Sequence, residues 1–212
     1  MRIGILGSGL MGAKLGTILA RAGHDVTFSY SHSNAKLKKL ARDVNAKWGT
    51  PADAAQKADA VLIAVHWSKI DDVLQQAGDL KGRVVITCSL PMNAADSGLV
   101  IGHGSSGAEQ LAKKVRGAAV VAAFQTVPSE VLFDVFESRR KKNRPSLVYC
   151  GDDDRAKKLA ATLIRDVGFE PFDIGGLQQA RYTEPFALVI AAIAYNGERG
   201  AEMSYRFEWS EK

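Results

Sequence analysis

MRIGILGSGLMG, at residues 1–12, joins an apolar segment to a glycine-rich turn. The apolar residues 3–6 predict a buried strand, and residues 13–22 carry a helical pattern. The G-x-G-x-x-G loop between them uses glycine for three reasons: a tight turn at Gly7, close approach of a pyrophosphate at Gly9, and close helix packing at Gly12. The helix N-terminus offers unpaired N–H groups to the phosphate. We therefore favour a dinucleotide site over a plain tight turn, formed by the loop residues Gly7, Ser8, Gly9, Leu10, Met11 and Gly12.

The composition is that of an ordinary globular protein. The 212 residues are 46% hydrophobic and 24% charged, which suits one domain with an appendage. The apolar run at residues 186–194 falls short of the roughly 20 residues that span a bilayer. With no signal-like segment either, we expect a cytoplasmic protein without a membrane partner. Cys88 and Cys150 are then expected to be reduced and buried.

The net charge of +5 raises the question of a nucleic-acid partner. Much of the basic excess lies in one run, residues 139–144, which has no interleaved aromatic residues. Such a run is typical of a solvated loop, so we expect no nucleic acid to bind. A basic balance also suits a protein that binds a multiply charged phosphate cofactor.

The second strand, residues 26–29, ends without an acidic residue. In NAD-binding folds an Asp or Glu about 20 residues beyond the glycine loop holds the ribose hydroxyls. Here hydroxyl groups, a histidine and a lysine stand in its place, and these can donate to a ribose phosphate. NADP is therefore preferred over NAD, although Ser31 and Ser33 could also cap the next helix, residues 34–43. The candidate residues are Ser29, Tyr30, Ser31, His32, Ser33 and Lys36.

Further strands alternate with helices along the rest of the chain. Apolar runs predict strands at residues 60–65, 84–87, 119–124, 147–150 and 170–174, with a short strand near Trp48. Helices are expected between them, at residues 70–77 and 108–115 among others. This alternation predicts an α/β fold with a Rossmann-type, doubly wound, mostly parallel sheet. We expect an NADP-binding domain at residues 1–174 and a small C-terminal helical segment at residues 175–212.

Ligands of open α/β sheets bind outside the carboxyl ends of the strands, and this rule selects three further groups of residues. Strand 60–65 ends at Val65, His66 and Trp67, although Trp67 could equally pack against the following helix. The next strand leads into Ser89, Leu90 and Pro91. After strand 119–124 come a polar amide and a rigid prolyl turn, which we expect to contact a substrate: Gln125, Thr126, Val127 and Pro128.

Two segments contain residues that are common in hydrolase or metal sites, but their spacing argues against both kinds of site. The loop at residues 93–107 is rich in glycine and serine, yet neither Ser105 nor Ser106 lies in a G-x-S-x-G elbow. We expect a flap, with one of these serines capping the next helix. The consecutive acids at residues 152–154 cannot all face one ion, so they are expected to cap a helix rather than bind a metal.

A long helix is expected at residues 177–196, with a kink at Pro185. Its second half, residues 186–194, is apolar on nearly all sides. A helix without a polar face must be buried, so we expect it to form a homodimer interface or a lid over the cofactor.

Taken together, the chain resembles the F420-dependent NADP oxidoreductase family and, more distantly, the cytoplasmic oxidoreductase domain of the six-transmembrane metalloreductases. The matching segments cover nearly the whole chain: GILGSGLMG at 4–12, SYSHS at 29–33, AVHW at 64–67, AFQTVPSEVLFD at 123–134, VYCGDDDRAKK at 148–158 and FEPFDIGGLQQAR at 169–181. The resemblance implies NADP held by residues 7–12 with Ser31, His32 and Lys36. It also implies a flat ring near residues 125–128, and dimerisation through the C-terminal helix.

The expected activity is hydride transfer between NADPH and a flat redox cofactor, with F420 favoured. Such a reaction needs alignment of two rings more than an acid or base, so no residue is predicted to be a catalytic proton donor. Two alternatives remain open. One is an NADPH-dependent reductase of a flavin, a quinone or a ferric chelate, and the other is a non-catalytic NADP-binding sensor.

Overall fold

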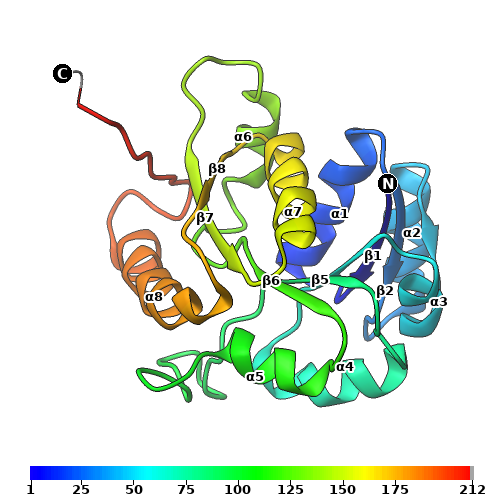
Figure 1. The fold of residues 1–212 in the computed structure, drawn as a ribbon. Helices are drawn as coiled ribbons and strands as arrows, with labels where there is room; N and C mark the ends of the chain where they lie inside the picture. The colour runs from blue at the N-terminus through cyan, green and yellow to red at the C-terminus, as the bar shows by residue number, and fades with distance from the viewer. Residues whose placement is uncertain (211–212) are drawn as a thin grey trace.

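The computed structural model describes residues 1–210 and contains one eight-stranded sheet between two layers of helices (Figure 1). The strands are β1 (Arg2–Leu6), β2 (Asp25–Ser29), β3 (Lys47–Trp48), β4 (Ala60–Ile63), β5 (Val84–Thr87), β6 (Ala119–Ala122), β7 (Ser146–Gly151) and β8 (Glu170–Asp173). The helices are α1 (Leu10–Arg21), α2 (Asn34–Asp43), α3 (Pro51–Gln56), α4 (Ile70–Ala77), α5 (Gly107–Lys114), α6 (Leu132–Glu137), α7 (Asp154–Val167) and α8 (Ala180–Asn196). Two short 3₁₀ helices are η1 (Trp67–Lys69) and η2 (Leu177–Gln179).

The strand order is β3-β2-β1-β4-β5-β6-β7-β8. All neighbours pair in parallel except β6 and β7, which are antiparallel. Strand β1 is central, and Ile3 pairs with Val26 of β2 on one side and with Ala60 of β4 on the other. The order reverses between β1 and β4, which is the switch point where such sheets bind ligands. The predicted mostly parallel Rossmann-type sheet is therefore confirmed.

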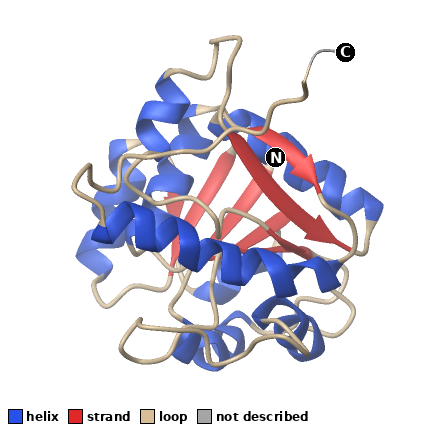
Figure 2. Ribbon diagram, turned by 90° about the vertical axis from the view of Figure 1, so that its left-hand side faces the viewer, coloured by secondary structure: helices blue, strands red, loops and turns tan. Residues whose placement is uncertain are grey.

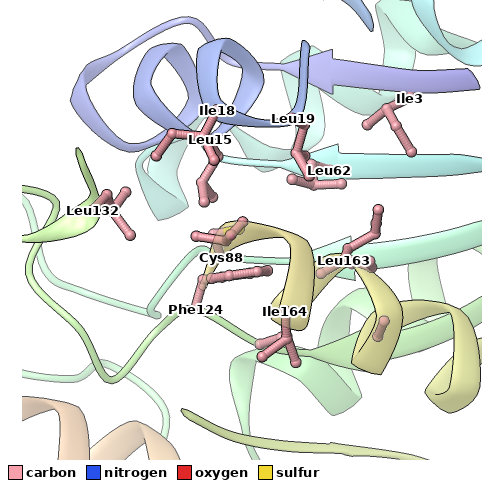
Figure 3. Close-up of a cluster of buried hydrophobic side chains, with 14 of the residues drawn as sticks. Ile3, Leu15, Ile18, Leu19, Leu62, Cys88, Phe124, Leu132, Leu163 and Ile164 are labelled. Atoms are coloured by element: carbon pink, nitrogen blue, oxygen red, sulfur yellow. The ribbon is translucent and has the colours of Figure 1, made fainter. Parts of the chain in front are cut away.

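Alternate residues of each strand enter the two layers of the core. One layer packs the sheet against α1, α2, α6 and α7; Figure 3 shows Leu15 and Ile18 of α1 opposite Leu163 and Ile164 of α7. The other layer packs the sheet against α3, α4, α5 and the start of α8. Both faces are covered, which explains why the strands read as continuous apolar runs.

The local capping signals fix most helix starts. Helices α2 and α4 have the predicted bounds, and Ser33 accepts a hydrogen bond from the Lys36 amide at the start of α2. Ser106 caps α5 and Asp153 caps α7, as expected for these residue types. Helix α1 begins at Leu10, earlier than the predicted residue 13, because Gly9 is already its N-cap residue.

Helix α8 crosses the front of the sheet in the view of Figure 2. Within the single chain, residues 186–194 are buried on one face only, and the expected dimer interface or lid stays a prediction. Ala187, Ile190 and Ala194 are buried, whereas Val189 and Ile193 are exposed on the opposite face. One face of α8 is therefore buried and the other is exposed. The sequence does not distinguish the two faces, because both carry small or β-branched apolar residues.

After α8 the chain returns along the edge of β7. The Ser146 amide donates to the Tyr205 carbonyl at 2.8 Å, and the Phe207 amide donates to the Ser146 hydroxyl at 2.8 Å. The ring of Tyr205 packs edge-on against Phe186 of α8, with centroids 5.4 Å apart. This C-terminal tail thus contacts both the sheet and α8. The predicted division of the chain into a domain at residues 1–174 and a segment at residues 175–212 stays a prediction.

Two further expectations concern the surface. The basic run at residues 139–144 lies in the loop between α6 and β7, where most of its residues are exposed. Within residues 1–210 the structure has no helix long and apolar enough to span a bilayer.

Candidate functional site

The three glycines of the loop between β1 and α1 have different surroundings. Gly7 has a φ of +112°, and a Cβ atom there would lie 2.4 Å from the Ala64 carbonyl oxygen. A Cβ atom on Gly12 would lie 1.8 Å from the Gly7 carbonyl oxygen. At Gly9, in contrast, a Cβ atom would meet no protein atom within 4 Å. The first and last glycines are therefore required by the fold, while the middle one leaves open space above the backbone.

That open space lies at the N-terminus of α1. Gly9 is the N-cap residue, and within residues 1–210 no side chain caps this helix or places an acid in its first turn. Two other helices of the sheet layers do have such groups: Ser33 caps α2, and Asp153 caps α7. The first amides of α1 are thus available to an anion, and the helix dipole favours one there. A cofactor pyrophosphate fits this cradle.

A first cavity, the β2 cavity, lies beyond the carboxyl end of β2 and has a volume of about 630 Å³. On one side Tyr30 donates a hydrogen bond to the Asp72 carboxylate on α4. This bond and burial raise the pKa of Tyr30 to about 12, so its phenol stays protonated. The lining residues are Tyr30, Ser31, His32, Asn34, Leu37, Trp48, Gly49, Thr50, Pro51, Asp53, Lys69, Asp72 and Gln76.

The residues proposed to bind the ribose phosphate differ in their positions. Ser31 and His32 line the β2 cavity, and Lys36 is exposed on the first turn of α2. The Ser33 hydroxyl caps α2, so the capping role considered from the sequence is present at this residue. The Ser29 hydroxyl is fully buried and donates to the Ile5 carbonyl at 2.8 Å. Ser29 therefore supports the loop from below and does not face the cavity.

Ser8 has a similar supporting part in the glycine loop. Its buried hydroxyl donates to the Ser29 carbonyl at 2.9 Å, and its amide donates to the Tyr30 carbonyl at 3.1 Å. These bonds tie the loop to the end of β2, so that the two halves of the cofactor site move together.

A second cavity, the strand-end cavity, lies on the other side of the glycine loop and has a volume of about 280 Å³. The segments after β1, β4, β5 and β6 form its walls, and α8 closes it. Most of its lining is apolar. The lining residues are Leu10, Met11, Val65, His66, Cys88, Ser89, Leu90, Met92, Phe124, Gln125, Val127, Pro128, Ser129, Ala187, Ile190, Ala191 and Tyr195.

Most candidates at the strand ends meet in this cavity, but three do not line it. Trp67 is half-buried and packs beside α4 and the adjoining core. Pro91 is buried, and its ring approaches Gly107 closely. The Thr126 hydroxyl is buried and bonds to the Tyr205 hydroxyl at 2.7 Å. These three side chains support the cavity wall from behind.

The turn after β6 has an unusual backbone. Phe124 has a φ of +64° although its side chain is large and completely buried. A bulky residue in this region is strained, and such strain concentrates at functional sites where the surroundings enforce it. The conformation directs the chain into Gln125, and Lys14 of α1 secures the far end of the turn by donating to the Ser129 carbonyl at 3.0 Å.

His66 connects the cavity to the loop at residues 93–107. Its Nδ1 accepts a hydrogen bond from the Ser68 amide at 3.2 Å, so Nε2 carries the proton. Nε2 lies 3.1 Å from the Asp96 carboxylate and 3.3 Å from the Asn93 carbonyl. Nδ1 thus holds the ring against η1, and Nε2 fastens the loop at residues 93–107, which the sequence predicted to be a flap.

Cys88 is the cavity residue with nucleophilic potential. Burial raises the pKa of its thiol to about 12, so the thiol is protonated at neutral pH. A protonated thiol is a poor nucleophile. Cys88 therefore contributes a small apolar surface to the cavity wall.

Sequence reasoning missed Glu184, the most deeply buried acid near the cavity. It lies on α8 and is only 1% exposed. Its carboxylate accepts hydrogen bonds from the Gly107 amide at 2.8 Å and the Ala108 amide at 3.0 Å, at the start of α5. Burial raises its pKa to about 7. A lone acid beside an otherwise apolar helical run was the available signal.

Helix α8 also supplies cavity residues that the sequence did not single out. Ala187, Ile190 and Ala191 form the apolar roof, and the Tyr195 hydroxyl donates to the Glu130 carboxylate at 3.1 Å. Nothing in the periodicity of this helix separates these positions from the exposed ones.

A Rossmann-type sheet, a helix without a side-chain cap behind a glycine loop and an apolar cavity beyond it together fit a dinucleotide-binding protein. Comparison with known proteins shows what the chain is similar to. Residues 2–91 match the family described as NADP oxidoreductase, coenzyme F420-dependent. This match spans β1 to the end of the β5 segment and agrees with the resemblance seen in the sequence motifs. This part of the chain is thus similar to a family of NADP-dependent oxidoreductases.

Three similar proteins extend the comparison. Metalloreductase STEAP3 from Rattus norvegicus is 28% identical over 187 residues, covering 88% of this chain and 36% of the relative. The chain thus spans about a third of the length of this curated relative. A structure from Arthrobacter sp. FB24, provisionally named an F420-dependent NADP reductase, has a TM-score of 0.86 at 22% identity and covers 99% of this chain and 100% of its own. A reductive aminase from Aspergillus terreus, in complex with NADPH, has a TM-score of 0.67 at 15% identity and covers 89% and 60%. At these identities the two structures establish the fold alone.

Proposed function

We propose that this protein transfers a hydride between NADPH and a flat redox cofactor, with F420 as the favoured acceptor. The observation that carries this proposal is the strand-end cavity, which begins at Leu10 and Met11 of the glycine-loop helix and continues to the turn at Gln125. It offers an apolar, covered space directly beside the nicotinamide end of a cofactor bound at that helix. The family match supports NADP as the cofactor and F420 as the acceptor.

The hydride chemistry belongs to the nicotinamide ring, and the protein supplies position and shielding. The first amides of α1 hold the pyrophosphate, and the space above Gly9 admits it. Ala187 and Ile190 of α8 cover the cavity and exclude water. Alignment of two rings within such a site supplies most of the rate enhancement for this kind of reaction.

The phosphate on the adenosine ribose distinguishes NADP from NAD. We propose that Ser31, His32 and Lys36 hold this phosphate at the mouth of the β2 cavity. Two carboxylates of that cavity are already engaged, since Asp72 accepts from Tyr30 and Asp53 forms a capping box with Thr50. Neither is at the end of β2, where an acid would repel the phosphate.

The decisive experiment follows NADPH oxidation by absorbance with F420, FMN, a quinone and a ferric chelate as parallel acceptors. We expect turnover with F420 at least tenfold above the rates with the other acceptors, and slower turnover when NADH replaces NADPH. Equal or faster turnover with another acceptor would refute F420 as the favoured acceptor. Cofactor binding without turnover by any acceptor would refute enzymatic activity and favour an NADP-binding sensor.

A reductase of ferric chelates or flavins is the second candidate. It is supported by the 28% identity to a metalloreductase, which covers 88% of this chain. The same assay separates the two candidates, because the ferric chelate reaction would then exceed the F420 reaction.

We also propose that the protein is a cytoplasmic homodimer. Val189 and Ile193 form part of an exposed apolar stripe along α8, on the face opposite the cavity. Apolar surface of this kind is usually covered by another protein surface. Cys88 and Cys150 are both free and buried, which suits a reducing compartment.

A further inference from the structure

The side-chain amide of Gln125 is held at the wall of the strand-end cavity. Its Nε2 donates a hydrogen bond to the Ser89 carbonyl at 2.7 Å. A carbonyl oxygen only accepts hydrogen bonds, so this contact selects the NH₂ end of the amide.

This arrangement fixes which end of the amide remains for a ligand. A flipped amide would place its carbonyl oxygen against the Ser89 carbonyl oxygen, which is repulsive. Among residues 1–210, Thr183 Oγ1 is the one fully buried side-chain nitrogen or oxygen without a hydrogen-bond partner, so Gln125 Oε1 is not in that group. Gln125 lines the cavity, and its Oε1 makes no hydrogen bond to the described residues, so this oxygen is open to the cavity.

Glu184 is itself held rigidly. It reaches from α8 to two amides at the start of α5, and it is almost completely buried. Next to it, Arg181 makes a two-point ion pair with Glu109, at 2.7 and 2.8 Å, which joins the same two helices. Helix α8, which forms the roof of the strand-end cavity, is thus fixed to the start of α5.

The other polar groups of the cavity are already engaged. The Ser89 hydroxyl donates to the Val65 carbonyl at 2.6 Å, and both nitrogens of His66 are used in bonds to Ser68, Asn93 and Asp96. The Tyr195 hydroxyl donates to Glu130. Gln125 Oε1 therefore stands out as a fixed acceptor on an otherwise apolar wall.

We propose that Gln125, positioned by the Ser89 carbonyl, selects a hydride acceptor whose planar ring carries an N–H group on its edge. This inference rests on the proposed function and names the substrate class. Lactam and imide edges, as in flavin-like and deazaflavin-like rings, meet the requirement, whereas a simple quinone does not. A site built around one buried hydrogen bond rejects ligands that lack its partner.

The test compares lumiflavin with N3-methyl-lumiflavin, which differ at one edge N–H. Binding of each to the NADP⁺-loaded protein is followed by flavin fluorescence, so that no turnover is needed. We expect lumiflavin to bind at least tenfold more tightly. In Gln125→Met, which keeps the side-chain length, this preference should fall to less than twofold.

The outcomes separate the inference from the proposed function. Equal binding of the two flavins by the unmodified protein would overturn the inference, even if NADPH oxidation by F420 or FMN were observed. A loss of NADP⁺ affinity in Gln125→Met with no change in flavin preference would overturn it too, since the amide would then serve the nicotinamide. Failure of every acceptor to oxidise NADPH would overturn the proposed function and the inference with it.

Discussion

Gly9 and Gly12 are three residues apart, yet they have opposite surroundings. A side chain at Gly12 would collide with the Gly7 carbonyl, whereas one at Gly9 would enter open space. The two positions therefore separate the requirements of the fold from those of the cofactor.

This contrast predicts different losses for two alanine substitutions. Gly12→Ala should destabilise the protein by about 1–3 kcal/mol through overpacking. Gly9→Ala should cost less than about 1 kcal/mol, the usual effect at an N-cap, while NADPH affinity falls at least about tenfold. Chemical denaturation and NADPH titration measure the two effects. Loss of stability without loss of affinity in Gly9→Ala would contradict the pyrophosphate site.

Glu184 predicts a pH dependence of stability. Burial raises its pKa from 4.5 to about 7, so the folded protein binds a proton more tightly than the unfolded chain. The resulting stabilisation is fully present below the unfolded pKa and is lost as the pH rises through the folded pKa. The unmodified protein should therefore lose stability between about pH 5 and pH 8 relative to Glu184→Gln.

Urea unfolding at both pH values measures this difference, and groups common to both proteins cancel. Glu198→Gln, at an exposed position after α8, is the matched control and should leave the pH dependence unchanged. Parallel curves for the unmodified protein and Glu184→Gln would show that Glu184 titrates normally.

At the scale of elements, α8 has two apolar faces with different tasks. One face closes the strand-end cavity through Ala187 and Ile190, and the other exposes Val189 and Ile193. The C-terminal tail continues this coupling, because Tyr205 contacts Phe186 of α8 and Thr126 of the cavity wall. Helix α8 thus connects the site to the surface on which we propose that two chains meet.

Val189→Glu should convert the proposed dimer to a monomer, since a charge in an apolar interface is desolvated without a partner. Val100→Glu is the matched control, because Val100 is similarly exposed, at 57% against 53%, but lies in the loop at residues 93–107. Light scattering after size-exclusion chromatography gives the mass of each variant. A monomeric unmodified protein, or dissociation by both substitutions, would contradict the proposed interface.

At the scale of the whole molecule, the proposed cofactor site runs from the β2 cavity across the glycine loop to the strand-end cavity. NADPH should therefore stabilise elements on both sides of the switch point. At a concentration of 100 times its dissociation constant, a ligand adds about 2.7 kcal/mol to the free energy of unfolding. We expect a clear rise in melting temperature with NADPH and a smaller one with NADH at the same concentration.

The double variant His32→Ala, Lys36→Ala should remove most of the difference between NADPH and NADH, because both residues are proposed to contact the ribose phosphate. Lys39→Ala, an exposed lysine further along α2, controls for a general loss of positive charge. Melting curves with each nucleotide provide the measurement. An unchanged difference in the double variant would place the phosphate elsewhere.

Much of the architecture could be predicted because local patterns carry it. Apolar runs located the strands, and capping residues such as Ser33 and Asp153 located helix starts. The glycine spacing predicted the tight turn between β1 and α1, where Gly7 and Gly12 leave no room for a side chain. The direction of β7 could not be predicted in this way, because its antiparallel pairing with β6 depends on contacts distant in sequence.

By itself, the sequence determined the Rossmann-type sheet, the glycine loop and the strand ends that border the site, because these follow from short-range sterics and periodicity. Only the tertiary structure decided which side chains line the cavities. It placed Thr126 behind the wall, engaged Ser29 below the loop, and joined Gln125 to Ser89, which lies 36 residues earlier in the chain. Such pairings arise when remote elements pack together, and burial then gives a single carboxylate or amide its properties.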